Sequence, residues 1–168
     1  YFSNNNNLHP QVSFDITDDQ EVSLISGRVC NQHGNTAEKF DLKDKISLEM
    51  VLQINTTAIT QFIAGFHVYT NDGLLLFPAN YSFNHTSQNS SKNLVKIICE
   101  IQDNLLNTGL HFVSLACSSW VNTSQRFFLK EEVLSFEVTE VISERKVDYF
   151  GEYPGAIRVD LKFDHELV

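Results

Sequence analysis

The sequence predicts an all-β domain, an antiparallel β-sandwich of roughly eight strands with immunoglobulin-like or jelly-roll topology. Three observations support this fold class. Apolar and polar residues alternate in short segments, turn-forming residues separate these segments, and no segment carries a helical apolar stripe over more than a few turns. Strands that are apolar on one face require two sheets packed face to face to bury that face.

The first residues differ in composition from the rest of the chain. A length of 168 residues suits one domain with a substantial core. Residues 1–20 contain an Asn run, a His-Pro break and few apolar side chains, which is typical of a linker. We predict a linker from an upstream domain at 1–20 and the sandwich at 21–168, with order beginning near Val12 or Val22. Because the chain starts at Tyr1, we expect a piece of a longer protein.

The strands follow one another with clear turn signals between them. The Asp72-Gly73 pair is the strongest hairpin signal, because it supplies the positive φ angles of a tight turn. Pro154-Gly155 marks a corner before the closing segment, whose apolar residues alternate with charged ones. In chain order the predicted strands are residues 21–32, 45–57, 62–71, 73–82, 93–103, 109–120, 132–141 and 155–165.

Alternation also assigns each strand's inner and outer face. Glu49 and Ser135 fall on the outer faces of their strands, where we expect them to meet water. The three cysteines lie in separated, mostly apolar segments and are predicted to be small buried hydrophobic residues. The predicted inward-facing residues include Ile46, Leu48, Met50, Leu52, Ile54, Val95, Ile97, Cys99, Ile101, Leu134, Phe136, Val138, Ile157, Val159, Leu161 and Phe163.

Charge and motifs exclude several classes of function. A net charge of -9 disfavours a nucleic-acid or anionic-membrane surface. The sequence has no GxxxxGK[ST] phosphate loop, no GxSxG or Cys/His nucleophile signature, and no HxH or HExxH spacing among its six histidines. We therefore predict no catalytic residues, no metal site and no cofactor.

Two features point to different compartments. An odd set of three cysteines without a CxxC spacing favours the reducing cytoplasm. Five N-x-S/T sequons leave a glycosylated, secreted protein open as the alternative. Their asparagines are Asn55, Asn80, Asn84, Asn89 and Asn122.

Four segments, in this order, resemble a known family. They are GFHVYTNDGLLLFPANYS at 65–82, LLNTGLHFVSLACSSW at 105–120, EEVLSFEVTE at 131–140 and YPGAIRVDLKF at 153–163. Their pattern is similar to the C-terminal carbohydrate-binding domain of Wzt-type ATPases from bacterial O-antigen ABC transporters. That family often ends its closing segment in Trp where this chain has Phe163.

The resemblance implies a function and a set of partners. In that family the domain follows an ATPase domain, binds the finished, undecaprenyl-linked O-polysaccharide in the cytoplasm, and permits its export through a membrane permease. It also implies a homodimer, in which the C-terminal strands could be exchanged, at the inner face of the inner membrane. Two alternatives remain: a secreted adhesive or structural immunoglobulin-like sandwich, and the same glycan-reading module fused to a glycan-modifying transferase.

Candidate sugar-binding residues lie on the outer faces of two strands. Sugars pack their C–H faces on aromatic rings, while amides, imidazoles and hydroxyls bind their hydroxyl groups. If His111, Val113, Leu115 and Cys117 face the core, small residues beside Trp120 face outward on the same strand. The predicted carbohydrate-binding residues are His67, Tyr69, Asn71, Ser114, Ser118 and Trp120.

Each of these residues also has a purely structural interpretation. Trp120 could cover an edge of the sandwich, and His67 with Tyr69 could form a cross-strand pair that only stabilises the sheet. Arg126 could bind an acidic sugar or be a solvated loop charge. The alternating residues Tyr81, Phe83 and His85 could belong to a loop that closes over a glycan or does nothing.

Overall fold

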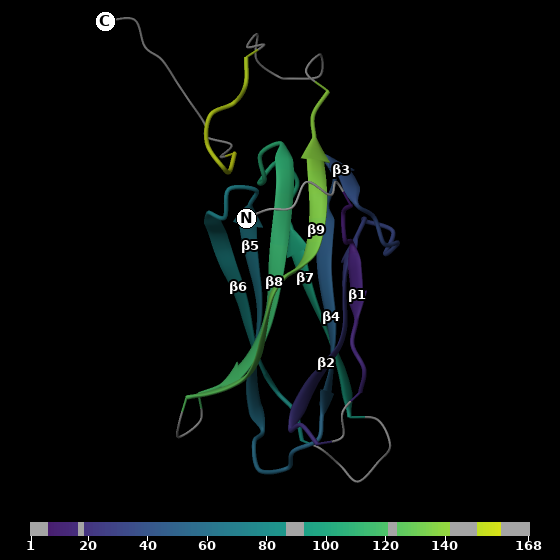
Figure 1. The fold of residues 1–168 in the computed structure, drawn as a ribbon, viewed down its shortest axis with the longest axis vertical. Coiled ribbons are helices and arrows are strands. Elements are labelled where there is room, and N and C mark those ends of the chain that lie inside the picture. Colours follow the sequence, from purple (N-terminus) through teal and green to yellow (C-terminus); the bar gives the residue numbers. More distant parts are fainter. Residues whose placement is uncertain (1–6, 17–18, 87–92, 121–123, 142–150, 159–168) are drawn as a thin grey trace, which may run out of the picture.

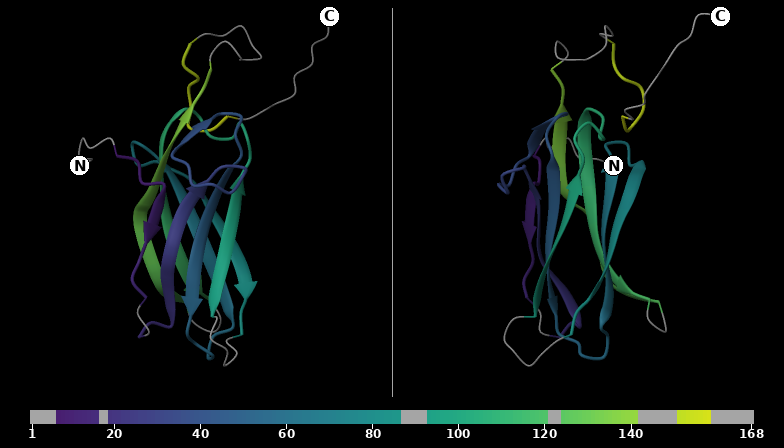
Figure 2. Two further views of the ribbon diagram at one scale, coloured as in Figure 1. Left: turned by 90° about the vertical axis from the view of Figure 1, so that its right-hand side faces the viewer. Right: turned by 180° about the vertical axis from the view of Figure 1, so that it is seen from behind.

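The computed structural model describes residues 7–16, 19–86, 93–120, 124–141 and 151–158. The chain forms two β-sheets packed face to face, with no helix in the described ranges (Figures 1 and 2). The all-β sandwich predicted from the sequence is therefore confirmed. The strands are β1 (Gln11–Ser13), β2 (Val22–Cys30), β3 (Lys39–Asp41), β4 (Ile46–Ile54), β5 (Gln61–Thr70), β6 (Leu75–Asn84), β7 (Leu94–Ile101), β8 (Gly109–Ser119) and β9 (Gln125–Thr139).

The two sheets differ in size and in their edges. One has four strands in the order β1-β2-β4-β7, and the other has five in the order β3-β9-β8-β5-β6. Neighbouring strands are antiparallel except β3 and β9, which pair in parallel. No described helix is long and apolar enough to cross a lipid bilayer.

The core lies between the sheets and follows the predicted alternation. Every second residue of β4 is buried, from Ile46 to Ile54, and Leu134, Phe136 and Val138 of β9 are buried as predicted. Of the cysteines, Cys30 and Cys117 are buried, Cys99 is half-buried, and all three thiols are free. Burial raises the pKa of the Cys117 thiol to about 12, so this side chain stays protonated and apolar at neutral pH.

At Gly27 on β2, side chains of the opposite sheet approach the backbone closely. A Cβ atom on this residue would lie 2.5 Å from Cδ1 of Leu115 on β8 and 3.5 Å from Cδ1 of Leu134 on β9. Leu115 therefore fills the space that a side chain on β2 would otherwise need. The absence of a side chain at Gly27 lets a leucine of the opposite sheet pack against the backbone of β2.

Glu49 lies on the outer face of β4 as predicted, but it is only 7% exposed. Arg28 Nε and Lys96 Nζ lie 2.6 and 2.9 Å from its Oε2 and cover it. Burial raises the pKa of the Glu49 carboxyl, but hydrogen bonds from Lys96 and Arg28 outweigh this effect and lower it overall. The expectation of a solvated carboxylate was wrong because basic side chains from both neighbouring strands cover it.

Ser135 also departs from expectation, because the N-terminal segment covers it. Its side chain is 3% exposed. The His9 amide donates to Ser135 Oγ at 2.8 Å, and the Ser135 amide donates to the His9 carbonyl at 2.8 Å. Further along, Gln11–Ser13 forms β1 on the other sheet. Residues 9–13, which the sequence assigned to a linker at 1–20, are thus bound to both sheets of the sandwich.

The closing segment is described only as far as Arg158, so the predicted strand at 155–165 lies mostly outside the described residues. Ile157 makes an isolated antiparallel bridge with Leu106 but is 43% exposed, so the prediction that it faces inward was wrong. Arg158 binds Glu140 through two hydrogen bonds of 2.7 and 2.8 Å and reaches Asn107 Oδ1 at 3.0 Å. The Asn107 amide in turn donates to the carbonyls of Tyr153 and Gly155. This network fixes residues 153–158 against the loop before β8.

Candidate functional site

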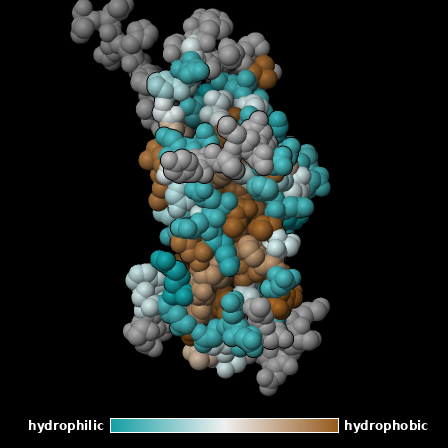
Figure 3. Space-filling view, viewed as in Figure 1, coloured by the Kyte–Doolittle hydropathy of each residue, from teal (hydrophilic) through white to brown (hydrophobic). Residues whose placement is uncertain are grey.

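The outer face of the five-stranded sheet carries most of the candidate residues. Over β8 and β9, which face the viewer in Figure 1, polar and apolar surface are interspersed (Figure 3). On β5 and β8 the strand register sets outward-facing residues side by side in four rows. These pairs are Tyr69 with Phe112, His67 with Ser114, Gly65 with Ala116, and Ile63 with Ser118.

Gly65 lies at the centre of this face, and the tips of side chains from two strands lie close over its bare backbone. A Cβ atom on Gly65 would lie 2.9 Å from Oδ1 of Asn80, 3.3 Å from Nε2 of His67 and 3.7 Å from the Cβ of Ala116. An amide oxygen and an imidazole nitrogen from two strands therefore converge on one point above the sheet. We call this set, Gly65 with His67, Asn80 and Ala116, the Gly65 hollow.

The Gly65 hollow has the chemistry of a hydroxyl-binding site. Burial, and then the positive charge of Arg126, lower the pKa of His67, so its ring is neutral at neutral pH. A neutral imidazole offers one donor and one acceptor nitrogen, and the Asn80 side chain offers an amide N–H and a carbonyl. The small Ala116 side chain and the bare backbone at Gly65 let the Asn80 and His67 tips lie close to the sheet, where the C–H face of a sugar ring could lie over them.

Sequence reasoning missed Gly65 and considered Asn80 only as a sequon. A glycine in the middle of an alternating strand was an available signal, because it often marks a close approach to the backbone. Asn80 had no such signal. It becomes part of the site only because β6 pairs with β5 in a register that sets it opposite Gly65.

Ser114 occupies the predicted row but makes a structural contact. Its side chain is 1% exposed, and its Oγ accepts a hydrogen bond of 2.9 Å from the Glu132 amide. Glu132 has a φ of 49° and lies in an irregular stretch of β9. The Ser114 hydroxyl thus stabilises the bulged backbone of β9 beneath the outer face.

The remaining predicted residues extend in a line on both sides of the Gly65 hollow. Tyr69 is half-buried beside Phe112, and Asn71 is exposed in the turn after β5. Ser118 is half-buried in the row that also includes Arg126. Trp120 follows the end of β8 and is 68% exposed. From the Tyr69 row to the Ser118 row the face extends about 20 Å at the usual rise of a strand.

This geometry suits an elongated ligand better than a compact one. The predicted residues are not gathered into a single pocket, because they belong to successive rows of one sheet face. A chain of several sugar rings laid along β5 and β8 could contact Tyr69, the Gly65 hollow and Ser118 in turn.

The aromatic residues Tyr81 and Phe83 stack on each other on the inner side of β6, at 6.2 Å between ring centroids.

Comparisons with known proteins give a family and a fold. The family model described as the Wzt C-terminal domain matches residues 15–150, which is more than half of the chain. A solved structure, "Crystal structure of the C-terminal domain of wzt", matches with a TM-score of 0.66 and 12% sequence identity. The match covers 93% of this chain and 87% of that chain. No curated protein matches the sequence.

Proposed function

Because the chain belongs to the Wzt C-terminal domain family, we propose that it binds bacterial O-antigen polysaccharide without catalysing a reaction. Binding of the finished glycan would be coupled to its export by an ABC transporter. The partners would be the undecaprenyl-linked glycan, an ATPase domain in the same transporter and a membrane permease, with the domain acting as a homodimer. Its place would be the cytoplasmic side of the inner membrane.

We place the glycan on the outer face of the five-stranded sheet. The observation that supports this choice is the convergence of Asn80 Oδ1 and His67 Nε2 above Gly65. Arg126 adds a positive charge on the same face, in a chain with a net charge of -9. Contacts of this kind exchange water for protein, so each contributes little and the affinity for one repeat unit should be micromolar to millimolar.

Titration with polysaccharide tests the proposal directly. The domain is titrated with the O-polysaccharide of its own source bacterium, followed by calorimetry and by amide shifts in NMR spectra, and an unrelated O-polysaccharide is the control. We expect selective binding, with shifts on β5, β6 and β8. If neither glycan binds at millimolar repeat-unit concentration, the adhesive or structural sandwich becomes the better interpretation.

Replacing Gly65 with alanine should weaken glycan binding by roughly tenfold, or about 1.4 kcal/mol. The added Cβ would push aside the Asn80 and His67 tips that converge there. Stability should change by less than about 1 kcal/mol, because the displaced atoms end flexible side chains and alanine is favoured over glycine within a strand. Calorimetry gives the affinity and urea unfolding gives the stability.

Gly34→Ala provides the matched control for this prediction. Gly34 has a φ of 77° and no atom within 4 Å of the position of a Cβ. Alanine there should cost about 1–2 kcal/mol through backbone strain and leave glycan binding unchanged. If Gly65→Ala binds the glycan as tightly as the wild-type chain, the Gly65 hollow is not part of the binding site.

The aromatic residues Trp120 and Tyr69 give a further expectation. Trp120→Ala and Tyr69→Ala should each weaken glycan binding while the thermal midpoint moves by only a few degrees. For Trp120 the reason is its large exposed ring, which contributes little to the core. A fall of more than about 10 °C in the midpoint would indicate a structural role.

A further inference from the structure

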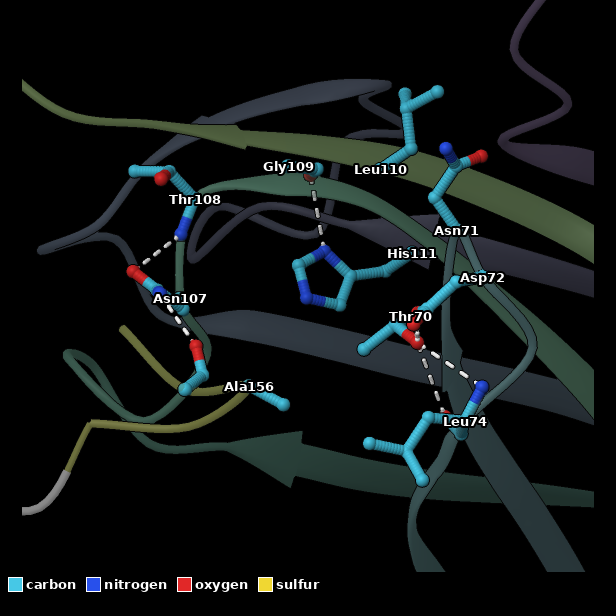
Figure 4. A pocket seen from close by; sticks show the side chains of 11 residues that line it. Thr70, Asn71, Asp72, Leu74, Asn107, Thr108, Gly109, Leu110, His111 and Ala156 are labelled. Carbon is cyan, nitrogen blue, oxygen red and sulfur yellow. Dashed lines mark hydrogen bonds between the residues drawn. The ribbon is translucent and has the colours of Figure 1, made fainter. Parts of the chain in front are cut away.

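A pocket lies at the end of the sandwich (Figure 4), and its lining shares no residue with the Gly65 hollow. The turn between β5 and β6, the loop that leads into β8, and residues 155–156 form its walls. Its volume is about 370 Å³, near the lower end of the roughly 300–1,000 Å³ typical of small-molecule sites. We call it the strand-end notch; its lining includes Thr70, Asn71, Leu74, Asn107, His111 and Ala156.

His111 gives the strand-end notch a hydrogen-bond acceptor. Its side chain is 2% exposed and stacks on Phe136, with 5.3 Å between ring centroids. Nδ1 lies 3.1 Å from the Gly109 carbonyl oxygen, and because a carbonyl only accepts, Nδ1 must carry the proton. Nε2 is then left with a free lone pair. Burial lowers the His111 pKa to about 4, so the ring is neutral at neutral pH.

Among the described residues, none forms a hydrogen bond with Nε2 of His111. In Figure 4 the imidazole projects between the Thr70 side and the Asn107 side of the notch. The Asn107 amide donates to Tyr153 and Gly155, and its oxygen accepts from Thr108 and Arg158. Thr70 Oγ1 is engaged with the Asp72 carboxylate and the Leu74 amide. Nε2 therefore remains available to accept a hydrogen bond from a ligand in the notch.

The rest of the lining selects the charge of that ligand. Among its described residues are Asp72 at the rim and the amide of Asn71, and none is Lys or Arg. The nearby Arg158 guanidinium is already bound to Glu140 and lies over the Tyr153 ring. An anion would meet the Asp72 carboxylate without a compensating cation. Leu74, Leu110 and Ala156 offer apolar surface, so the notch suits a neutral ring that carries both C–H faces and hydroxyl groups.

We propose that the strand-end notch binds one neutral sugar ring, with a sugar hydroxyl donating to Nε2 of His111. The choice of a sugar as the ligand rests on the proposed function. The residues that line the notch are not those of the Gly65 hollow. Asn71 lines the notch two residues after Tyr69, the end row of the outer face. A glycan lying along that face could therefore place one further sugar in the notch.

The test uses NMR with glucose, galactose, mannose and N-acetylglucosamine, each to about 0.1 M, a hundredfold above a millimolar Kd. At least one sugar should give saturable shifts of the Gly109, His111 and Ala156 amides and of the His111 Nε2 nitrogen. His111→Phe keeps a ring against Phe136 and removes the acceptor, and it should weaken this binding at least tenfold. The O-polysaccharide of the source bacterium should then shift the amide signals of both the notch and the outer face.

A second variant keeps the test valid if His111→Phe does not fold. Ala156→Met fills the notch from its wall and should abolish the shifts, whereas Ile157→Met changes an exposed neighbour outside the lining and should not. Absence of saturable notch shifts with all four sugars and with the polysaccharide would overturn the inference. If the polysaccharide shifts signals of the outer face but none of the notch, only the proposal that the notch binds a sugar is overturned. Shifts in the notch alone would overturn the placement of the glycan on the outer face.

Discussion

Replacing Leu115 with alanine should lower the free energy of unfolding by about 2–5 kcal/mol. Leu115 is fully buried on β8, and its Cδ1 fills the space above Gly27 on the opposite sheet. Truncation leaves a cavity between the two sheets, next to the bare backbone of Gly27. Urea unfolding measures the loss, and Leu94→Ala, at an exposed position of β7, should change stability by less than about 0.5 kcal/mol.

Gly27→Ala should also be destabilising, by about 1–3 kcal/mol, because its Cβ would overlap the Leu115 side chain. The two changes should not add when they are combined. In the double variant the alanine at 27 occupies space that the truncated residue has left, so the total loss should be smaller than the sum by about 0.5–3 kcal/mol. Strict additivity would show that Leu115 does not pack against Gly27.

A second large effect is expected at acid pH, where His111 should destabilise the fold. Burial lowers the His111 pKa from 6.5 to about 4, against the smaller opposing effect of the Gly109 carbonyl. Between these values the unfolded chain binds the proton and the folded chain does not. The stability from this residue is complete above the unfolded pKa and falls as pH decreases, reaching a loss of about 3 kcal/mol near pH 4.

His111→Phe should remove this part of the pH dependence. The difference in unfolding free energy between about pH 7.5 and about pH 4.5 should shrink by roughly 2–3 kcal/mol relative to the wild-type chain. Urea unfolding at both pH values gives the comparison. His33→Gln, at an exposed histidine outside the core, controls for the loss of any histidine. An unchanged pH slope in His111→Phe would show that His111 takes up its proton without opposing the fold.

Alternation in the sequence predicted the core well, because a strand in a two-layer fold buries every second residue whatever its neighbours are. The buried residues of β4 and the inward set Leu134, Phe136 and Val138 follow from this rule alone. The same rule cannot describe outer faces. Glu49 and Ser135 are covered by Arg28, Lys96 and His9, which come from distant parts of the chain.

The candidate site was less predictable for a related reason. His67 and Tyr69 could be assigned to an outer face from β5 alone, and their role in binding stays a prediction. The Gly65 hollow needs Asn80 from β6 and Ala116 from β8, which meet through the strand order and register of the five-stranded sheet. Alternation within one strand does not reveal which strand it pairs with or in which register, and β1 and β3, with three residues each, were too short to be recognised.

The crossing of residues 9–13 between the sheets has a mechanical consequence. His9 is bonded to β9, the Pro10 carbonyl accepts from Val29 on β2, and β1 continues along β2. A pulling force on the chain before His9 would therefore load both layers within a few residues. The bonds to the two layers would share the tension, so the sandwich should yield as a unit instead of losing its first strand alone.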